Sequence, residues 1–155
     1  MDSVNASSKA IAAVIYIRSV SKENHVTVQL VASKTKVAPL KKLTIPRLEL
    51  AGAVLLVKLI VQILSVLERH EIPIFGWIDS EVARTWITNH PSRWKEFVQN
   101  RVCFIQETLP QVIWKLTPGT QNPADLATRG LSATQLLEHV EWWTGPQWLR
   151  QDAPT

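Results

Sequence analysis

One long apolar run with a single polar stripe constrains this chain more than any other feature. Pro46 opens a predicted helix that extends to about Arg69 and contains the segment LAGAVLLVKLIVQILSVL. Proline suits the first turn of a helix, where its missing N–H costs nothing. The polar residues follow at offsets of four, three and four, on one side of the helix: Lys58, Gln62, Ser65 and Arg69. This pattern is typical of a core helix packed against a sheet.

The same run is long enough to raise the alternative of a membrane span. Lys58, near its middle, and the continuous polar stripe argue against insertion into a bilayer. The first residues, MDSVNASSK, have no basic segment followed by an apolar stretch, so they do not indicate a secretory signal. The single cysteine, Cys103, suits a reducing compartment. We therefore predict an intracellular protein without a membrane partner.

Strand and helix patterns alternate along the chain. Ala10–Val20 and His25–Ala32 are rich in β-branched residues and are predicted to form an antiparallel hairpin. The later predicted elements are the strand Ile72–Ile78, the helix 81–90, a helix from about Ser92 to Leu109, the strand Gln111–Leu116 and a helix that begins at Asn122. This order predicts an α/β fold with a mixed sheet.

The charge is unevenly distributed over the 155 residues. Residues 1–47 contain eight Lys or Arg against two Asp or Glu, a charge of +6, whereas the remainder contains nine against eleven, a charge of −2. A basic end beside an acidic remainder fits a nucleic-acid-binding protein with an acidic metal site. A solvated basic face fits the same numbers, so both interpretations stay open.

Glu49 is the ionisable residue that the helix pattern places least favourably. It precedes Lys58 by nine residues, which puts it on the side opposite the polar stripe, toward the sheet. A buried carboxylate needs a partner, such as a metal ion. The alternative is an acid in the first turn that interacts with the helix dipole.

Asp79 and Asp125 are two further candidate ligands. Asp79 lies at the carboxyl end of a predicted strand, where open α/β sheets bind ligands, although it could instead cap the next helix. Asp125 follows the predicted Asn122 cap by three residues, as a capping-box acid would. Clustered carboxylates bind Mg²⁺, and two such ions can promote hydrolysis of a phosphodiester.

Several segments in this order resemble a known family. They are Leu30–Ala53 (LVASKTKVAPLKKLTIPRLELAGA), Trp77–Ile87 (WIDSEVARTWI), Asn122–Gly130 (NPADLATRG) and Trp142–Leu149 (WWTGPQWL). Together they resemble the ribonuclease H-like region that follows the reverse transcriptase in BEL/Pao-type retrotransposon polyproteins. The resemblance implies an α/β, ribonuclease H-like fold with a mixed five-stranded sheet flanked by helices. It also implies hydrolysis of the RNA strand of an RNA–DNA hybrid, and reverse transcriptase and integrase regions as possible neighbours in a longer polyprotein.

By this resemblance Glu49, Asp79 and Asp125 are the catalytic residues and hold Mg²⁺, in a two-ion site. The family's first acid is replaced, since Asn5-Ala6-Ser7 stands where relatives have Asp-Ala-Ser. Asparagine is neutral and bridges two Mg²⁺ poorly. Asp2 is three residues away and faces the other side of an extended strand. We therefore expect a weakened metal site and low or absent activity, and whether the chain is an enzyme stays open.

The resemblance also organises the remainder of the chain. Residues 1–131 are predicted to form the ribonuclease H-like domain, with its first strand cut short by Met1, and residues 132–155 a Trp-rich C-terminal extension or connector. The truncation suggests a fragment or a decayed copy. A group of lysines on the connection into the Glu49 helix is predicted to contact nucleic-acid phosphates, or to be an ordinary solvated loop: Lys34, Lys36, Lys41 and Lys42. No small-molecule cofactor is predicted. The alternatives to an enzyme are a non-catalytic nucleic-acid-binding module and a structural remnant.

Overall fold

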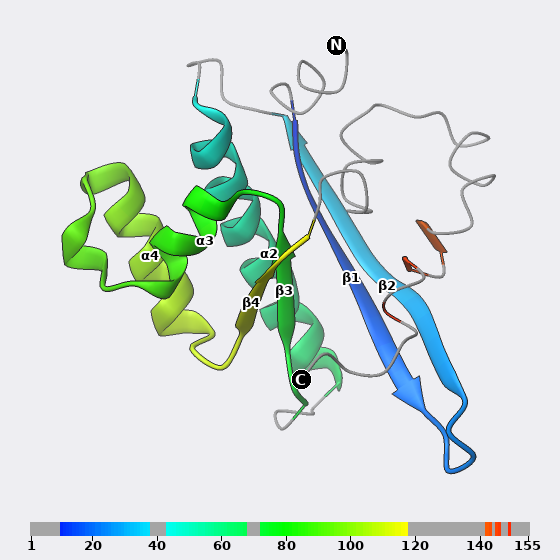
Figure 1. Ribbon diagram of the computed structural model, residues 1–155. Coiled ribbons are helices and arrows are strands. Elements are labelled where there is room, and N and C mark those ends of the chain that lie inside the picture. Colours follow the sequence, from blue (N-terminus) through cyan, green and yellow to red (C-terminus); the bar gives the residue numbers. More distant parts are fainter. Residues whose placement is uncertain are drawn as a thin grey trace.

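The computed structural model describes residues 10–37, 43–67, 72–117, 142–143, 145–146 and 149, and the structural statements below concern these residues. Strands and helices alternate in this part of the chain, as the sequence predicts (Figure 1). The elements are β1 (Ala10–Val20), β2 (Val26–Val37), α2 (Ile45–Leu67), β3 (Phe75–Ile78), α3 (Glu81–Thr88), the short 3₁₀ helix η1 (Pro91–Arg93), α4 (Glu96–Thr108) and β4 (Ile113–Leu116).

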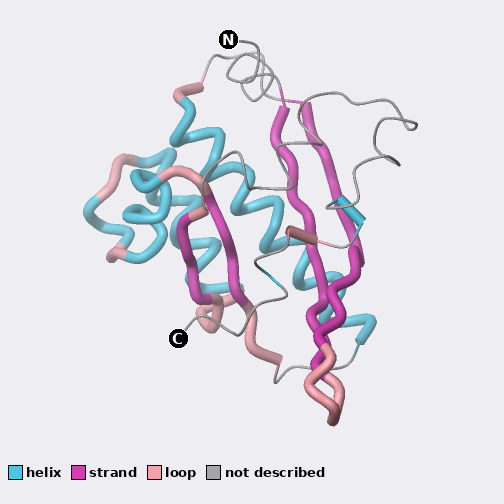
Figure 2. Tube along the Cα trace, turned by 45° about the vertical axis from the view of Figure 1, so that its right-hand side comes forward, coloured by secondary structure: helices cyan, strands magenta, loops and turns pink. Residues whose placement is uncertain are grey.

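Helix α2 is the centre of the fold, with the hairpin β1–β2 against one side and α3 and α4 against another (Figures 1 and 2). One row of its side chains, which includes Leu50 and Val57, joins the main core with α3, α4, β3 and β4. A second row, Leu55 and Leu59, packs on Ala13 of β1. The polar stripe is confirmed where it is described, because Lys58, Gln62 and Ser65 are exposed.

Among the described residues, α2 is the one helix that length and composition would allow to cross a membrane. It begins at Ile45, one residue before the predicted start at Pro46, and its described part ends at Leu67. Its packing on both the hairpin and the helical layer favours the interpretation as a core helix.

The predicted antiparallel hairpin is confirmed, and β1 has the predicted bounds. The Ser21 side chain closes the turn by accepting hydrogen bonds from the backbone N–H groups of Glu23 and His25, at 3.3 and 3.0 Å. Asn24 takes a left-handed conformation, with φ of 63°, which asparagine tolerates better than most residues.

A β-bulge at Val31 divides the hairpin into two parts. Ile15 pairs with Ala32, but the next residue, Tyr16, pairs with Leu30, so Val31 is the extra residue. Paired residues lie on the same face of a sheet. Ala32 therefore faces α2 with Ile15, whereas Leu30 shares the opposite face with Tyr16.

The C-terminal tail, described at residues 142–143, 145–146 and 149, packs on the face of the hairpin that is turned away from α2. The Tyr16 hydroxyl donates to the Trp142 carbonyl at 2.6 Å, and the Arg18 Nε donates to the Leu149 carbonyl at 2.8 Å. Gly145, with φ of 77°, lies so close to Val28 that a Cβ there would be 2.7 Å from the valine Cγ1. The predicted boundary between residues 131 and 132 lies outside the described residues and stays a prediction.

The predicted α/β class is confirmed, but the single five-stranded sheet is not seen in the described part of the chain. Its four strands form two separate sheets, the antiparallel pair β1–β2 and the parallel pair β3–β4. Because β3 and β4 are parallel, their carboxyl ends meet at one edge.

Several predicted boundaries are wrong. Strand β4 begins at Ile113 rather than Gln111, and α3 ends at Thr88 rather than at residue 90. Strand β2 continues five residues beyond Ala32, to Val37, because pairing with β1 resumes after the bulge. Strand β3 begins at Phe75 rather than Ile72, after Pro73, which has no N–H to donate to a ladder. The helix expected from about Ser92 is divided into η1 and α4, because Trp94 has an extended backbone and its indole N–H donates to the Trp86 carbonyl.

Candidate active site

Glu49 is held by the first half of α2. It is the fifth residue of the helix, just beyond the first turn in which the sequence predicts it, because the helix begins at Ile45 and its first backbone bond joins Leu48 N–H to the Thr44 carbonyl. The carboxylate side chain is half-buried. The effect of a helix dipole falls off within the first turn, so this position weakens the alternative explanation for Glu49.

Gly52, one turn after Glu49, shows on which side of α2 the Glu49 side chain lies. Gly52 lies beside β1, where a Cβ would be 3.9 Å from the Ala12 carbonyl oxygen. Residues three apart share a side of a helix. Glu49 therefore lies on the hairpin side of α2, as its offset from Lys58 predicts.

Asp79 follows β3 directly and is exposed. The neighbouring residue, Ser80, is the N-cap of α3, and its hydroxyl accepts from the Ala83 N–H at 3.2 Å. The alternative role of Asp79 as the helix cap is thus taken by Ser80. Within the described residues the exposed Asp79 carboxylate has no hydrogen bond or ion pair.

The two carboxylates belong to elements that meet at one end of the molecule. Strand β3 runs toward the end at which α2 begins, and β2 also ends there before the chain enters α2 (Figure 1). Glu49 and Asp79 are accordingly placed toward the same end, which is also the carboxyl edge of the parallel pair β3–β4. This is the edge at which α/β sheets usually bind their ligands.

Two of the four lysines predicted to bind phosphate lie in a different element from the one expected. Lys34 and Lys36 lie within β2 and not on a connection, because the strand is longer than predicted, and both side chains are exposed. They pair with Ala13 and Ile11 of β1. Since Ala13 packs against α2, both lysines lie on the α2 face of the hairpin, near the end at which α2 begins.

Several predicted site residues lie outside the described residues: Asn5, Lys41, Lys42 and Asp125. Within the described ranges, no group of three or more His, Cys, Asp or Glu side chains is arranged to hold a metal ion. Glu49 and Asp79 are thus a two-carboxylate part of the predicted three-carboxylate set, and the metal site stays a prediction.

The first half of the chain matches a known protein family. A model of the Pao retrotransposon-like RNaseH-like domain matches residues 3–80, which are 78 of the 155 residues. The chain belongs to this family. The matched part of this Pao-family domain contains the two described residues of the predicted carboxylate set, Glu49 and Asp79. It also contains Lys34 and Lys36. No curated protein matches the chain. No solved structure matches it either.

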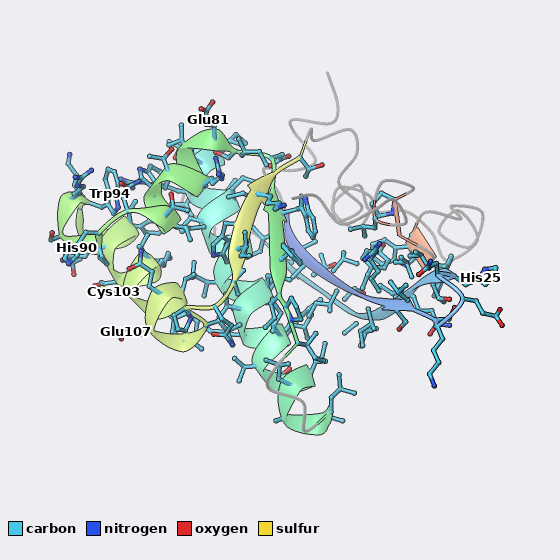
Figure 3. All side chains as sticks on the ribbon, turned by 60° about the horizontal axis from the view of Figure 1, so that its bottom comes forward. His25, Glu81, His90, Trp94, Cys103 and Glu107 are labelled. Carbon is cyan, nitrogen blue, oxygen red and sulfur yellow. The ribbon has the colours of Figure 1, made fainter. Side chains whose placement is uncertain are left out.

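Outside its matched region, the Pao-family chain has a hollow between η1 and α4 that the sequence does not predict. His90, Cys103 and Glu107 line it, on the side of the molecule away from the hairpin turn that carries His25 (Figure 3). The His90 Nδ1 lies 2.7 Å from the Ser92 hydroxyl, and the Gln106 amide donates to the carbonyls of Ile87 and Asn89. The Gln106 bonds fasten α4 to the end of α3, whereas the His90–Ser92 contact is local to the start of η1.

Proposed function

We propose that this chain is the ribonuclease H-like, nucleic-acid-binding domain of a retrotransposon Pol polyprotein. Its ancestral reaction is the Mg²⁺-dependent hydrolysis of RNA in an RNA–DNA hybrid, and Asn5 impairs that reaction. The observation that carries the proposal is the Asp79 carboxylate, which is exposed at the end of β3. It does not cap α3, because the neighbouring Ser80 is the N-cap of that helix. The family match supports the fold and the general chemistry.

The chemistry of the two described donors fits Mg²⁺, which prefers carboxylate oxygens and retains several of its waters. Glu49 and Asp79 would hold the ion with Asp125, and the bound ion would supply an activated water and charge stabilisation. The half-buried position of Glu49 limits water around its carboxylate, whereas the exposed Asp79 leaves room for a substrate phosphate. Asn5 would offer one neutral oxygen where the family has an acid.

The five-stranded sheet is part of the same proposal. β1 pairs with β2 and β3 pairs with β4, so β1 and β3 each use one edge in the described pairings. Both sheets lie beside α2 (Figure 2). A first strand between β1 and β3 would join them into one sheet and bring its acid to the end of the molecule where Glu49 and Asp79 lie.

The deciding experiment is a Mg²⁺-dependent cleavage assay on a labelled RNA–DNA hybrid, with the wild type and Asn5→Asp side by side. We expect little cleavage by the wild type and an increase of orders of magnitude in Asn5→Asp, because the acid restores the bridging ligand. Asp79→Asn in the Asn5→Asp background should abolish the gain. Equal, robust cleavage by the wild type and Asn5→Asp would show that Asn5 is not disabling.

A non-catalytic nucleic-acid-binding module is the second candidate, favoured by the exposed Lys34 and Lys36 beside the start of α2. It predicts salt-dependent hybrid binding while neither the wild type nor Asn5→Asp cleaves. A structural remnant would fold but would bind no nucleic acid at low salt. Reverse transcriptase and integrase regions are the proposed neighbours in a longer polyprotein, and an intracellular location is proposed for the chain.

A further inference from the structure

A pair of arginines converges on one aromatic ring where α2 meets α4. The Arg47 Cζ, in the first turn of α2, lies 5.1 Å from the centroid of the Phe97 ring. The Arg101 Cζ, one turn after Phe97 on α4, lies 3.6 Å from the same centroid. Both guanidinium groups are therefore held near the same ring.

No acid neutralises this pair within the described residues. Neither guanidinium has an ion pair there, and the nearby Glu96, on the first turn of α4, is exposed and unpaired with either. Burial lowers the pKa of the Arg101 guanidinium, which shows that the group has lost part of its hydration. An arginine remains charged despite such a shift. Arg47 and Arg101 both lie against the Phe97 ring, so one anion beside that ring could accept hydrogen bonds from both guanidinium groups.

The donors needed to bind an anion are present. Of the five N–H groups of Arg101, one donates to the Phe97 carbonyl, at 3.0 Å. Arg47 uses no N–H in any hydrogen bond within the described residues. All three side chains of the cluster are half-buried, so each retains a surface in contact with solvent. Guanidinium groups match the geometry of phosphate oxygens and often bind them through two parallel bonds.

The place of the pair relative to the carboxylates suggests which phosphate it meets. Arg47 precedes Glu49 by two residues, which is about 200° around a helix, so the two side chains leave α2 on opposite sides. A helix with its side chains is about 10–12 Å wide, and one strand of a duplex advances about 3.4 Å per nucleotide. A strand that crosses α2 from the carboxylates to the arginine pair would span at least this width, which is about three nucleotides.

From these contacts we infer that Arg47 and Arg101, held on Phe97, form a binding site for one backbone phosphate of a nucleic-acid strand. The inference rests on the proposed function insofar as it takes the ligand to be nucleic acid, but it does not require cleavage. It adds a contact on the α4 side of α2 to the lysines on the hairpin side, so that a bound strand would be held on both flanks of the helix.

The test measures binding of a labelled RNA–DNA hybrid by fluorescence anisotropy in Ca²⁺, over a range of salt concentrations. The double variant Arg47→Gln/Arg101→Gln is compared with Arg93→Gln, which removes one charge from the exposed η1 helix. We expect the double variant to bind about tenfold more weakly, since it loses a charge-assisted contact. The slope of log affinity against log salt should fall by about 0.9 or less, as for one phosphate. Arg93→Gln should bind as the wild type does.

A second measurement identifies the phosphate. Hybrids that carry one uncharged methylphosphonate linkage are scanned position by position along each strand. The wild type should be weakened by one position that the double variant ignores. If the double variant does not fold, Arg47→Lys/Arg101→Lys keeps both charges and should lose this positional sensitivity while keeping most of the affinity. Inorganic phosphate, added to the wild type in thermal unfolding, shows whether the pair also takes a free ion.

Each outcome bears on the inference separately from the proposed function. Unchanged affinity and salt slope in the double variant overturn the inference, even if Asn5→Asp cleaves the hybrid. Equal losses in Arg93→Gln and the double variant also overturn it, because they indicate a diffuse attraction. Thermal stabilisation by free phosphate without any hybrid effect overturns the assignment to a backbone phosphate. Arginine-dependent binding without cleavage by Asn5→Asp supports the inference and contradicts the catalytic proposal.

Discussion

The hairpin and the helical body of this molecule are built in different ways. Among the residues that the structure describes, the helical body, formed by α2–α4 with β3 and β4, shares a core of thirteen buried residues. The hairpin β1–β2 shares a cluster of three, Ala13 with Leu55 and Leu59, and is held on its other face by the tail around Trp142. The body is thus stabilised mainly by apolar burial, and the hairpin by docking on two remote parts of the chain.

This difference matters for the candidate site, which lies where the two regions meet. Glu49 leaves α2 on the hairpin side, whereas Asp79 follows a strand of the body. A change that loosens the hairpin should therefore disturb the surroundings of Glu49 while Asp79 keeps its place. Variants in the two regions should therefore differ in their effect on stability.

The largest effect is expected from truncating the core of the body. Leu50→Ala removes a fully buried side chain and should lower the free energy of unfolding by about 3–5 kcal/mol. Leu59→Ala, in the hairpin cluster, should cost about 2–3 kcal/mol, since Leu59 is at the margin of burial and its site can relax. Urea unfolding of both variants checks this. Equal losses would contradict the view that the two regions differ.

Overpacking within the body is expected to have the next largest effect. A Cβ at Gly76 would lie 2.6 Å from two ring atoms of the buried Trp114 on the neighbouring strand. Gly76→Ala should cost about 1–3 kcal/mol, because the ring has little room to move. Gly52→Ala is the matched control: its Cβ would make an ordinary contact at 3.9 Å, and alanine favours a helix by about 0.5–1 kcal/mol. A neutral Gly76→Ala in thermal unfolding would contradict the tight packing.

A smaller global effect is expected where the tail docks on the hairpin. Tyr16→Phe removes the hydroxyl that donates to the Trp142 carbonyl and should cost about 0.5–1.5 kcal/mol. Because the lost bond joins only the tail and the hairpin, hydrogen exchange should rise in these two regions but not in α4. Uniform acceleration over all regions would show that the hairpin and the body unfold as one unit.

Much of the fold could be predicted from periodicity alone. The β-branched run of β1 and the polar stripe of α2 gave the correct element types with bounds within about two residues, because each pattern lasts for several turns or pleats. The bulge at Val31 could not be predicted, since one extra residue leaves the sequence on both sides of it strand-like. The break before α4 could not be predicted either, because the residues at the break, Trp94 and Lys95, are neither Gly nor Pro.

The candidate site was predictable to a lesser degree. The position of Glu49 followed from its offset to the polar stripe, which is a local property of one helix. Asp79 and Ser80 are adjacent and are both good helix caps, so only the backbone decides that Ser80 takes this role. The Arg47–Phe97 contact joins residues fifty positions apart, and no local pattern signals a contact at that range.

The bulge at Val31 has a consequence for how the length of β2 can change. On the turn side of the bulge, Val28 packs under the tail; beyond it, Lys34 and Lys36 share the α2 face with Ala13. Deleting Val31 itself would leave Lys34 and Lys36 opposite Ala13 and Ile11, so both lysines would stay on the α2 face. Deleting an ordinary residue beyond the bulge, such as Ser33, would instead turn the two lysines to the opposite face and bring Thr35 and Val37 to α2. The bulge is therefore a position at which β2 can lose a residue without moving charge away from α2.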